Sequence, residues 1–497
     1  MKGEMMKIGV MGAGALALFA GCAILPSVGP SYEQPEFEIA EFELPDAGMP
    51  TTNRTASGEW QPAAGAEDAR AVITTNEICQ WWTRFDDARL TNLVERAVAG
   101  NLSFAMAQQR VEAARWTLFG SGAAFLPQVT GVAGFSRFEK WPNTQTMVGT
   151  GRRLHRDLFS SGFDATWEID IFGGSRRAME AAGAEYEAAE WGLADAWVML
   201  TAEVGREYIQ LRTTQQRIAV ARTNLVLQRE TYDILKSRLD SGIGDELAVN
   251  QSKYIADQTL ATIPPLLAQE EELLNAIAIL TGELPGAHHE ELKDCPDRDW
   301  LIEPQKIAAV PLNQLRNRPD VRVAERQLAA QVARIGVAKS MWYPKLFING
   351  SLGLESVKMA DFLKKDSFYG AIGPSISWPI FQGGNVYARV KVEEARMEEA
   401  RLKYAAALQN AYRDVRDAYA RYTQQYHRYQ ALQGAVKAAQ DAVAISNDLY
   451  KNGLRDFTAV IDAQRSLLAL EEALVISRGQ ITLELLSLYK ALGGGLI

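Results

Sequence analysis

Few residues of this chain could carry out catalysis or hold a metal ion. Its 497 residues include four histidines and three cysteines, which leaves little material for a metal cluster or a disulfide scaffold. His288 and His289 are followed directly by two glutamates, but adjacent side chains point apart, so we expect a solvated loop here and no metal site. We find no nucleophile beside a base, no phosphate loop and no zinc motif. The sequence therefore predicts neither enzymatic activity nor a bound cofactor.

The charge balance argues against a nucleic-acid partner. The chain carries 52 basic and 61 acidic side chains, a formal net charge of -9, whereas a surface that binds nucleic acid is basic. Hydrophobic residues make up 47% of the chain and charged residues 23%. This composition fits neither a disordered chain nor a helical membrane transporter.

The N-terminus has the pattern of an export signal. Lys2 and Lys7 precede an apolar run over residues 8–20, which is too short to span a bilayer as a helix and is typical of a secretory signal. We therefore predict a signal peptide over residues 1–21. No other run approaches the roughly 18 apolar residues of a transmembrane helix, so if this chain crosses a membrane, it does so with strands.

The signal ends in a sequence that resembles the processing box of bacterial lipoproteins. The small residues Ala20 and Gly21 stand directly before Cys22, and in such proteins this cysteine becomes the lipidated N-terminus. An ordinary cleavage site with an incidental cysteine is the alternative. Ala23 stands where Asp would signal inner-membrane retention, so sorting to the outer membrane is implied. After the lipid on Cys22, residues 22–80 lack periodicity and are expected to form an extended arm.

The rest of the chain consists of two copies of an internal sequence repeat. A helical pattern ends at Pro127 in the first copy and at Pro344 in the second, 217 positions later. Farther along the offset becomes 211, and it relates Trp167 to Trp378. The same offset relates Gly242 to Gly453, Asp245 to Asp456 and Gly282 to Gly493. An offset kept over more than a hundred residues is not expected by chance.

Each copy is predicted to contain a helix, two strands, a long helix, a tight turn and a returning helix. The first copy occupies residues 81–285 and the second residues 311–497, with a separate segment over residues 286–310. The tight turns are expected near Gly242 and Gly453. The expected strands are residues 128–138, 159–171, 346–355 and 369–380.

The expected strands alternate between apolar and polar residues. In residues 159–171 the odd positions are mostly apolar and the even positions are polar or glycine, and Ile372 and Ile376 share one face while Ser375 and Ser377 share the other. Ten or so alternating residues suit a tilted strand of a membrane barrel that has one face in lipid. On pattern alone, a soluble sheet with one wet face is the alternative.

Two segments without proline are long enough to dominate the fold. Residues 175–238 would extend roughly 96 Å as a helix, and residues 385–450 about the same. Helices of this length indicate coiled-coil-like packing rather than a compact core. Pro264 and Pro265 are expected to bend or break the returning helix of the first copy.

Four membrane strands cannot close a barrel, since the smallest bacterial barrels have about eight. Open strand edges cannot face lipid, because their N–H and C=O groups would be unpaired. Two copies would give eight strands, whose interior is filled by side chains, whereas three copies would give twelve strands and a lumen. We therefore predict a mainly helical chain with membrane strands, in which a trimeric 12-stranded β-barrel is continued by a long helical barrel.

Five short motifs occur over some 400 residues. In chain order, the motifs are Trp81-Trp82-x-x-Phe85-x-Asp87-x-Arg89-Leu90, Arg318-Pro319-Asp320-Val321, Trp378-Pro379-Ile380-Phe381-x-Gly383-Gly384, Asp462-Ala463-Gln464-Arg465-Ser466-Leu467 and Leu488-Tyr489-Lys490-Ala491-Leu492-Gly493-Gly494-Gly495. With these motifs the mature chain resembles the TolC-type outer membrane factors, in particular the lipoprotein branch that serves resistance-nodulation-division efflux pumps.

The resemblance implies a homotrimeric channel in the bacterial outer membrane with a long periplasmic extension. Such a channel passively conducts substrates to the exterior from a periplasmic adaptor protein and an inner-membrane resistance-nodulation-division pump. A mixed equatorial region would include residues 286–310 and the N-terminal arm, where Cys79 and Cys295 could form a disulfide in an oxidising compartment. The alternatives are the duct of a type I secretion system and a lipid-anchored periplasmic coiled-coil scaffold without a pore.

The resemblance also implies a gate at the periplasmic helix tips. Asp462 falls where the family places an inward-pointing acidic residue, and a ring of three carboxylates favours cations. Tyr450 and Arg455 fall where relatives tie neighbouring hairpins shut. Arg465 lies three residues after Asp462, so the two can pair on one helix face. A solvated helix surface is the alternative for each of these charges.

The tip departs from the family pattern at one position. Some relatives carry a second acidic ring three residues before the first, and here that position is Ala459, so we expect a single ring. Asp245 and Glu246 at the first turn could partly replace the missing charge.

Replacing Cys22 with Ser should abolish the incorporation of labelled fatty acid, because the serine hydroxyl cannot take the place of the thiol that carries the lipid. Labelling of cells with a radioactive or clickable fatty acid measures this directly. We expect trimer formation to persist, since assembly rests on barrel closure and helix packing. A lipidated mature protein in the Cys22→Ser variant would overturn the assignment.

Overall fold

A computed structural model of the chain describes residues 27–35, 52–54, 60–62, 80–140, 154–293, 315–452 and 454–494. The expected signal peptide over residues 1–21 and the four residues Cys22, Cys79, Cys295 and Gly453 lie outside the described residues.

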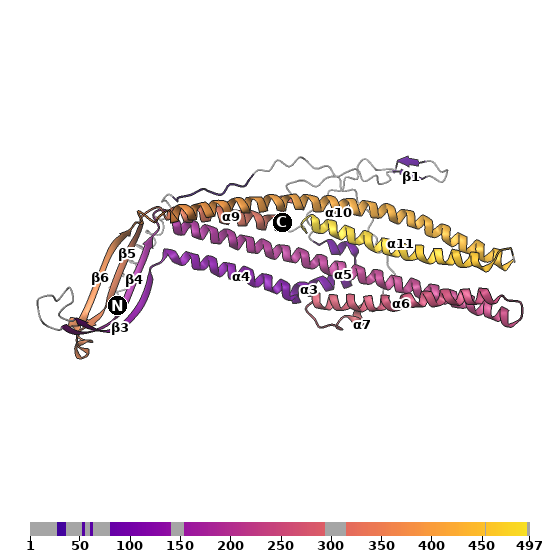
Figure 1. Cartoon of the computed structure of the whole chain (residues 1–497), viewed down its shortest axis with the longest axis horizontal. Helices are drawn as coiled ribbons and strands as arrows, with labels where there is room; N and C mark the ends of the chain where they lie inside the picture. The colour runs from indigo at the N-terminus through magenta and orange to yellow at the C-terminus, as the bar shows by residue number, and fades with distance from the viewer. Residues whose placement is uncertain are drawn as a thin grey trace, which may run out of the picture. The chain divides into compact units, whose positions relative to one another are not determined.

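The described elements repeat in the predicted order (Figure 1). The first copy contains α3 (Ala88–Gly100), α4 (Leu102–Gly122), β3 (Gln128–Lys140), β4 (Leu154–Ile169), α5 (Gly174–Asp240) and α6 (Glu246–Leu280). The second contains α9 (Pro319–Ser340), β5 (Lys345–Ser356), β6 (Phe368–Ser377), α10 (Asn385–Lys451) and α11 (Phe457–Ala491). Shorter elements are β1 (Thr52–Arg54), β2 (Trp60–Pro62), η1 (Trp81–Phe85), η2 (Ala123–Phe125), α7 (His289–Leu292), η3 (Met359–Asp361) and η4 (Lys365–Ser367).

The two copies match residue by residue in their long helices. Helices α5 and α10 each have 67 residues, and α6 and α11 each have 35. All four helices begin and end at positions that are 211 residues apart between the copies. The offset of 211 residues, which the sequence shows at single glycine, aspartate and tryptophan pairs, therefore holds through the whole of both hairpins.

The four long strands form one antiparallel sheet in the order β3-β4-β5-β6 (Figure 1). Gln128 pairs with Thr166 in the first strand pair, and the equivalent residues Lys345 and Ser377 pair in the second. Both copies therefore use the same register. A tryptophan anchors the base of each pair, because Trp167 Nε1 donates to the carbonyl of Phe125 at 2.9 Å and Trp378 Nε1 donates to that of Trp342 at 3.1 Å.

The register sorts the side chains onto two different faces, since residues directly opposite each other share a face. One face is largely apolar, and Phe163 pairs there with Leu352. The other is largely polar, and Asn349 Nδ2 donates there to Ser375 Oγ at 2.7 Å. The apolar face carries Phe159, Phe163, Trp167, Ile348, Leu352, Ile372 and Ile376. Large apolar side chains are exposed on it, for example 83% for Ile372.

The strand ends differ from the expected ones for local reasons. Strand β6 stops at Ser377 rather than at residue 380, because Pro379 has no N–H group to donate to a ladder. Strand β4 stops at Ile169 rather than at residue 171. There the carboxylate of Asp170 turns away to accept a hydrogen bond from the backbone N–H of Arg176 at 2.9 Å.

The prolines in α6 do not break it. We expected these residues to bend or break the helix. Helix α6 continues through Pro264 and Pro265, so the break is wrong, and the bend stays a prediction. Both prolines lie on the exposed side, while Ile263 and Leu266 next to them are buried. Water can therefore reach the carbonyl groups that lose their donors, and the buried side chains hold the two adjoining turns.

The chain divides into two compact units that cut across the repeats. One contains residues 1–36, 111–189 and 324–404, and the other residues 37–110, 190–323 and 405–497. The first unit holds the sheet and the helix ends that lead into it. The second holds the hairpins α5–α6 and α10–α11. Among the described residues, no helix combines the length and the apolarity that crossing a membrane requires.

A buried cluster organises the second unit and explains the first of the sequence motifs, which begins at Trp81. Trp81 is 2% exposed, and its ring meets those of Trp82 and Phe85 edge-on at 5.8 Å. Asp87 caps α3 by accepting from Arg89 N at 2.9 Å and also accepts from the hydroxyl of Tyr208 at 2.5 Å. Burial and this carboxylate raise the pKa of Tyr208. The motif therefore fixes α3 against α5.

The Arg-Pro-Asp motif closes the end of α11. Arg318 Nη1 donates to the carbonyl of Ala491 at 2.8 Å, and its Nη2 pairs with Asp320 at 2.8 Å. A guanidinium that binds the last carbonyls of a helix satisfies groups that otherwise lack a donor. The motif thus links the start of α9 to the C-terminal end of α11.

Both returning helices end in the same glycine turn. Gly282 has φ +78 and Gly493 has φ +90, and the next residue in each case donates its N–H to a carbonyl five residues back, Glu283 to Ala278 at 2.8 Å and Gly494 to Tyr489 at 3.2 Å. This is the Schellman arrangement, which favours glycine. At Gly282 the chain also crosses Gly100, whose carbonyl oxygen lies 2.0 Å from the position of an added Cβ.

Gly282→Ala should destabilise the fold by about 2 kcal/mol or more, because positive φ alone costs an L-residue about 1–2 kcal/mol and the new Cβ meets backbone that cannot turn aside. The thermal midpoint followed by far-ultraviolet circular dichroism measures the loss. The matched control is Gly434→Ala in α10, where an added Cβ would meet no described atom within 4 Å outside its own helix backbone and chain neighbours. That change should be neutral or stabilising by up to about 1 kcal/mol. Equal midpoints for the two variants would contradict the crossing.

Candidate functional site at the helical hairpin tips

The first hairpin turns at Gly242. Gly242 has φ +77, and Ile243 N donates to the carbonyl of Arg238 at 3.1 Å. The equivalent bond at the second tip runs from Leu454 N to the carbonyl of Leu449 at 2.9 Å. The two tips therefore share a Schellman turn, although Gly453 itself lies outside the described residues.

An apolar cluster joins the two hairpins close to their tips. It is formed by Leu235, Ala248, Val249, Ile255, Phe457, Val460 and Ile461, which come from α5, α6 and α11. Tyr450 packs against this cluster, and its ring lies 5.1 Å from that of Phe457. The ring of Tyr450 thus helps to hold the second turn against its own hairpin.

Arg465 connects the two hairpins on the exposed side of this cluster. Its Nη2 donates a hydrogen bond to the hydroxyl of Tyr254 on α6, and its guanidinium lies over the ring of Tyr254 at 5.5 Å from the centroid. Arg465 Nη1 also lies 3.9 Å from Asp462 Oδ1. One arginine therefore contacts an acid on its own helix and a tyrosine on the opposite hairpin.

The two other charged positions at the tips are exposed. The Asp462 side chain is 67% exposed, and Arg455 is exposed in the turn before α11. At the first tip, Asp245 caps α6 by accepting from Leu247 N at 3.0 Å. Glu246 follows it in the first turn of the helix, where a negative charge is favourable.

Sequence reasoning missed Tyr254. It lies 211 positions before Arg465, so the two residues occupy equivalent places in the two copies and face each other where α6 and α11 contact. The repeat offset could have revealed the pair, because equivalent positions of two copies that pack face to face meet near their shared axis. Aromatic and cationic residues at such a pair of positions favour a contact.

His288 is not in a solvated loop, as the sequence had suggested. Its side chain is fully buried, and its Nε2 lies 2.8 Å from the hydroxyl of Thr281. Buried polar groups require such partners, and the contact folds α7 back onto the end of α6. His289 points elsewhere and bonds Glu271 at 2.7 Å, which raises the pKa of His289. The described residues contain no group of three or more His, Cys, Asp or Glu that could hold a metal ion.

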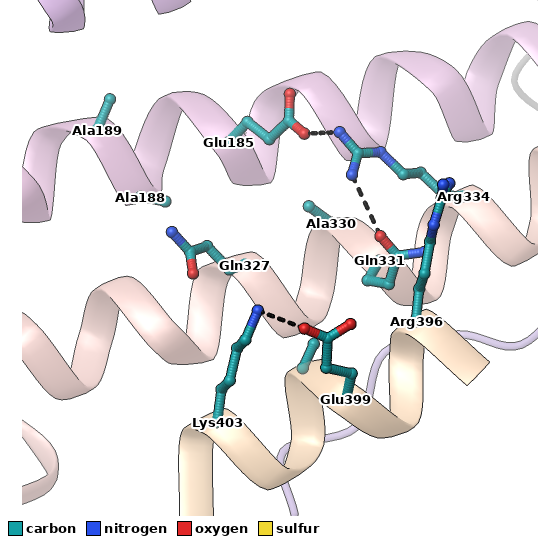
Figure 2. A pocket seen from close by; sticks show the side chains of 11 residues that line it. Glu185, Ala188, Ala189, Gln327, Ala330, Gln331, Arg334, Arg396, Glu399 and Lys403 are labelled. Carbon is teal, nitrogen blue, oxygen red and sulfur yellow. Dashed lines mark hydrogen bonds and ion pairs between the residues drawn. The ribbon is translucent and has the colours of Figure 1, made fainter. Parts of the chain in front are cut away.

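A groove of about 590 Å³, lined by charged, glutamine and alanine side chains, lies in the first unit between α5, α9 and α10 (Figure 2). In it, Arg334 lies between Glu185, with which it forms an ion pair, and Gln331, which accepts from it at 3.2 Å. Lys403 pairs with Glu399 at 2.7 Å and lowers the pKa of that carboxylate. The groove is thus lined by paired charges of both signs.

The N-terminal arm covers the other side of α9. Val28 N donates to the carbonyl of Phe172 at 3.1 Å, Gly29 packs against Gly336, and Tyr32 bonds Glu325 at 3.3 Å. At 3.6 residues per turn, positions 325 and 336 lie on the side of α9 opposite to the groove residues Gln331 and Arg334. One face of α9 therefore meets the arm, and the opposite face carries the charged, glutamine and alanine side chains that line the groove.

Comparison with known proteins gives a consistent result. The family described as outer membrane efflux protein matches residues 93–283 and 310–494. The pyoverdine export outer membrane protein OpmQ of Pseudomonas aeruginosa is 29% identical over 444 residues, which cover 88% of this chain and 91% of OpmQ.

Solved structures of outer membrane channels are also similar. The outer-membrane channel OprN superposes with a TM-score of 0.81 at 29% identity, covering 94% of this chain and 99% of OprN. The open state of the MtrE channel of Neisseria gonorrhoeae gives a TM-score of 0.75 at 26% identity, covering 95% and 98%. This likeness confirms the predicted fold class. The chain belongs to the outer membrane efflux protein family and is an efflux channel of the bacterial outer membrane with a periplasmic extension.

Proposed function

We propose that three copies of this chain form the exit duct of a tripartite efflux system and receive substrates from a periplasmic adaptor and an inner-membrane resistance-nodulation-division pump. The observation that carries the proposal is a four-stranded sheet with one apolar face and two open edges, β3 and β6. The duct conducts passively and needs no catalysis or cofactor of its own.

A trimer gives the edge strands of the sheet hydrogen-bond partners and also leaves an open lumen. The open edges of β3 and β6 cannot face hydrocarbon, because their backbone groups would lack partners. Twelve strands from three copies close the ring and leave a lumen, whereas eight from two copies would be filled by side chains. The apolar face then meets lipid, and the polar face with Asn349 and Ser375 meets water.

The groove on α9 supports a polar lumen below the barrel. The N-terminal arm is held near Phe172 through Val28. If Cys22 carries a lipid, the arm must run along the outside of the tube, because the acyl chains insert into the membrane. The opposite face of α9, with Arg334 and Gln331, then faces inward. Paired charges such as Glu185 with Arg334 would make the lumen surface hydrated, and their opposite signs would largely cancel its electrostatic potential.

The position of the arm also supports a lipid on Cys22. Val28 is bonded to Phe172 at the base of the strands, and six residues span at most about 21 Å when fully extended. An acyl group on Cys22 would therefore be tethered close to the membrane end of the helices. This length suits an anchor in the inner leaflet of the outer membrane.

The hairpin tips are the proposed gate. Asp462 from three copies would form a ring of carboxylates, with Arg465 beside it. Opening requires the hairpins to separate, and this is opposed by the bond from Arg465 to Tyr254 and by the apolar cluster that joins the two hairpins. Arg455 is exposed and available to a neighbouring hairpin.

Purified protein in planar lipid bilayers tests the proposed duct. We expect ion conductance together with a trimer that resists dissociation in detergent gels until it is heated. A coiled-coil scaffold without a pore would give neither heat-modifiable mobility nor conductance, and that result would reject the duct. Copurification with an adaptor and a resistance-nodulation-division pump, rather than with a type I secretion pump, tests the proposed partners.

Asp462→Ala should reduce the preference of the channel for cations, because three carboxylates leave the narrowest point of the pathway. The reversal potential in a salt gradient measures this preference. The matched control is Asp448→Ala, in the last turns of α10 and outside the proposed ring. Unchanged selectivity in Asp462→Ala would place the ring elsewhere, and Asp245 or Glu246 would then be the better candidates.

Arg455→Ala and Tyr254→Phe should each raise the fraction of open channels, and therefore the mean conductance measured in planar lipid bilayers. The first removes a charge that is proposed to tie neighbouring hairpins. The second removes one hydrogen bond of about 0.5–1.5 kcal/mol, which corresponds to roughly a two- to tenfold shift toward opening. Tyr232→Phe, on α5 beside the apolar cluster, is the control. Conductance no higher than in the control for both variants would exclude these contacts as ties.

A further inference from the structure

The internal repeat also predicts how neighbouring subunits of the proposed trimer contact each other. Within the chain, β4 of the first copy of the repeat pairs with β5 of the second. In the proposed trimer, β6 of one subunit must pair with β3 of the next, so the second copy of the repeat again meets a first copy. The contact inside the chain is therefore a template for the contact between subunits.

Inside the chain, the corner where β4 passes into α5 is filled. The ring of Phe172 stacks on that of Tyr343 at 4.7 Å. A Cβ on Gly174 would meet Ser340 Oγ at 2.6 Å. The second copy of the repeat, through Ser340 and Tyr343, thus covers the end of the first strand pair.

The equivalent corner where β6 passes into α10 is bare. Ile380 is 83% exposed and Phe381 is 90% exposed. No described atom lies within 4 Å of the position that a Cβ would take on Gly383 or Gly384. The residue equivalent to Tyr343 is Leu126, 217 positions earlier, and it is 52% exposed.

The two corners also differ in chemistry. Asp170 and Arg176 form an ion pair at 3.4 Å in the filled corner. The residues 211 positions later are Phe381 and Tyr387, both exposed. A charged pair thus occurs where the chain covers itself, and two aromatic residues occur where the described residues leave both side chains exposed. Aromatic side chains in such a place suit burial against another subunit.

We infer that, in the proposed trimer, β6 pairs with β3 of the next subunit in the register of β4 with β5, and that Phe381 and Tyr387 are buried at this seam. Thr166 pairs with Asn349 inside the chain. Carried over by the two offsets, Ser377 lies opposite the partner subunit's Val132. The corner that holds Phe381 then packs against the partner subunit's Leu126.

This register keeps the faces of the sheet continuous. It places Ile376 opposite the partner subunit's Ala133, so apolar positions meet apolar positions. A slip by one residue would turn every side chain of β6 to the wrong face. The competing arrangement is a slip by two residues, which keeps the faces and moves each partner by about 6.6 Å along the strand.

Cysteine cross-linking of the full-length trimer separates these registers. Ser377→Cys is combined in turn with Val132→Cys, Thr130→Cys and Gly134→Cys, with Cys79 and Cys295 replaced by Ser. A disulfide needs Cβ atoms roughly 4 Å apart, so only the Val132 pair should give covalent trimers under mild oxidation. The single Ser377→Cys variant is the control for unspecific links.

The outcomes distinguish the seam from the duct itself. Faster cross-linking of the Thr130 or Gly134 pair would overturn the register while the trimer stands. Absence of any intersubunit link in a conducting, heat-modifiable trimer would overturn the pairing of β6 with β3. Absence of both trimer and conductance in the parent protein would reject the proposed function instead.

A second variant tests the buried corner independently. Phe381→Asp should lower the temperature at which the trimer dissociates in detergent, because a carboxylate would be buried at the seam. Leu363→Asp is the matched control, since Leu363 is 84% exposed in the loop between β5 and β6, at the opposite end of β6 from Phe381. Equal dissociation temperatures for Phe381→Asp and Leu363→Asp would overturn the burial of Phe381.

Discussion

Every N–H and C=O group of a strand that lies in hydrocarbon needs a hydrogen-bond partner, because no water is available there. Within this chain the condition is met between β3, β4, β5 and β6 and is left open at the two outer strands. The alternation of apolar and polar faces follows from the same condition, since a closed ring in a membrane has one side in lipid and one in water. The helices that continue from the strands then inherit the circular order of the strands.

The helical hairpins satisfy a different requirement. A helix of 67 residues satisfies its own backbone along its length, so only its ends and its side chains need partners. Glycine turns such as those at Gly242 and Gly282 close the ends. The apolar cluster with Phe457 and the contact of Arg465 with Tyr254 join the two hairpins near their tips.

The sequence was most informative where its signal is long. Two stretches without proline and two constant offsets were enough to predict the hairpins. The alternation of apolar and polar residues, clearest in residues 159–171 and 369–380, was enough to predict which residues of those strands share a face of the sheet. The ends of strands were less predictable, because they depend on single contacts such as that of Asp170 with Arg176. The contact of Tyr254 was missed because it joins two hairpins that are far apart in the sequence.

Buried polar residues were the hardest to predict. His288 lies beside charged residues and reads as a surface position, yet it is enclosed because the chain folds α7 back onto Thr281. The two prolines of α6 led to a different error, since a break was predicted in a helix that is continuous. Their exposed position, which the sequence does not reveal, lets water satisfy the carbonyl groups that a proline leaves without a donor.

The two offsets of the repeat, 217 before the strand pairs and 211 after them, place the whole length difference between the copies in the connections at the far end of the sheet from the helices. A residue inserted anywhere else in one copy would shift a helix by 1.5 Å and rotate it by 100° against an equivalent partner of fixed length. The connection from β3 to β4 can therefore differ in length from that between β5 and β6 without changing how the equivalent helices match.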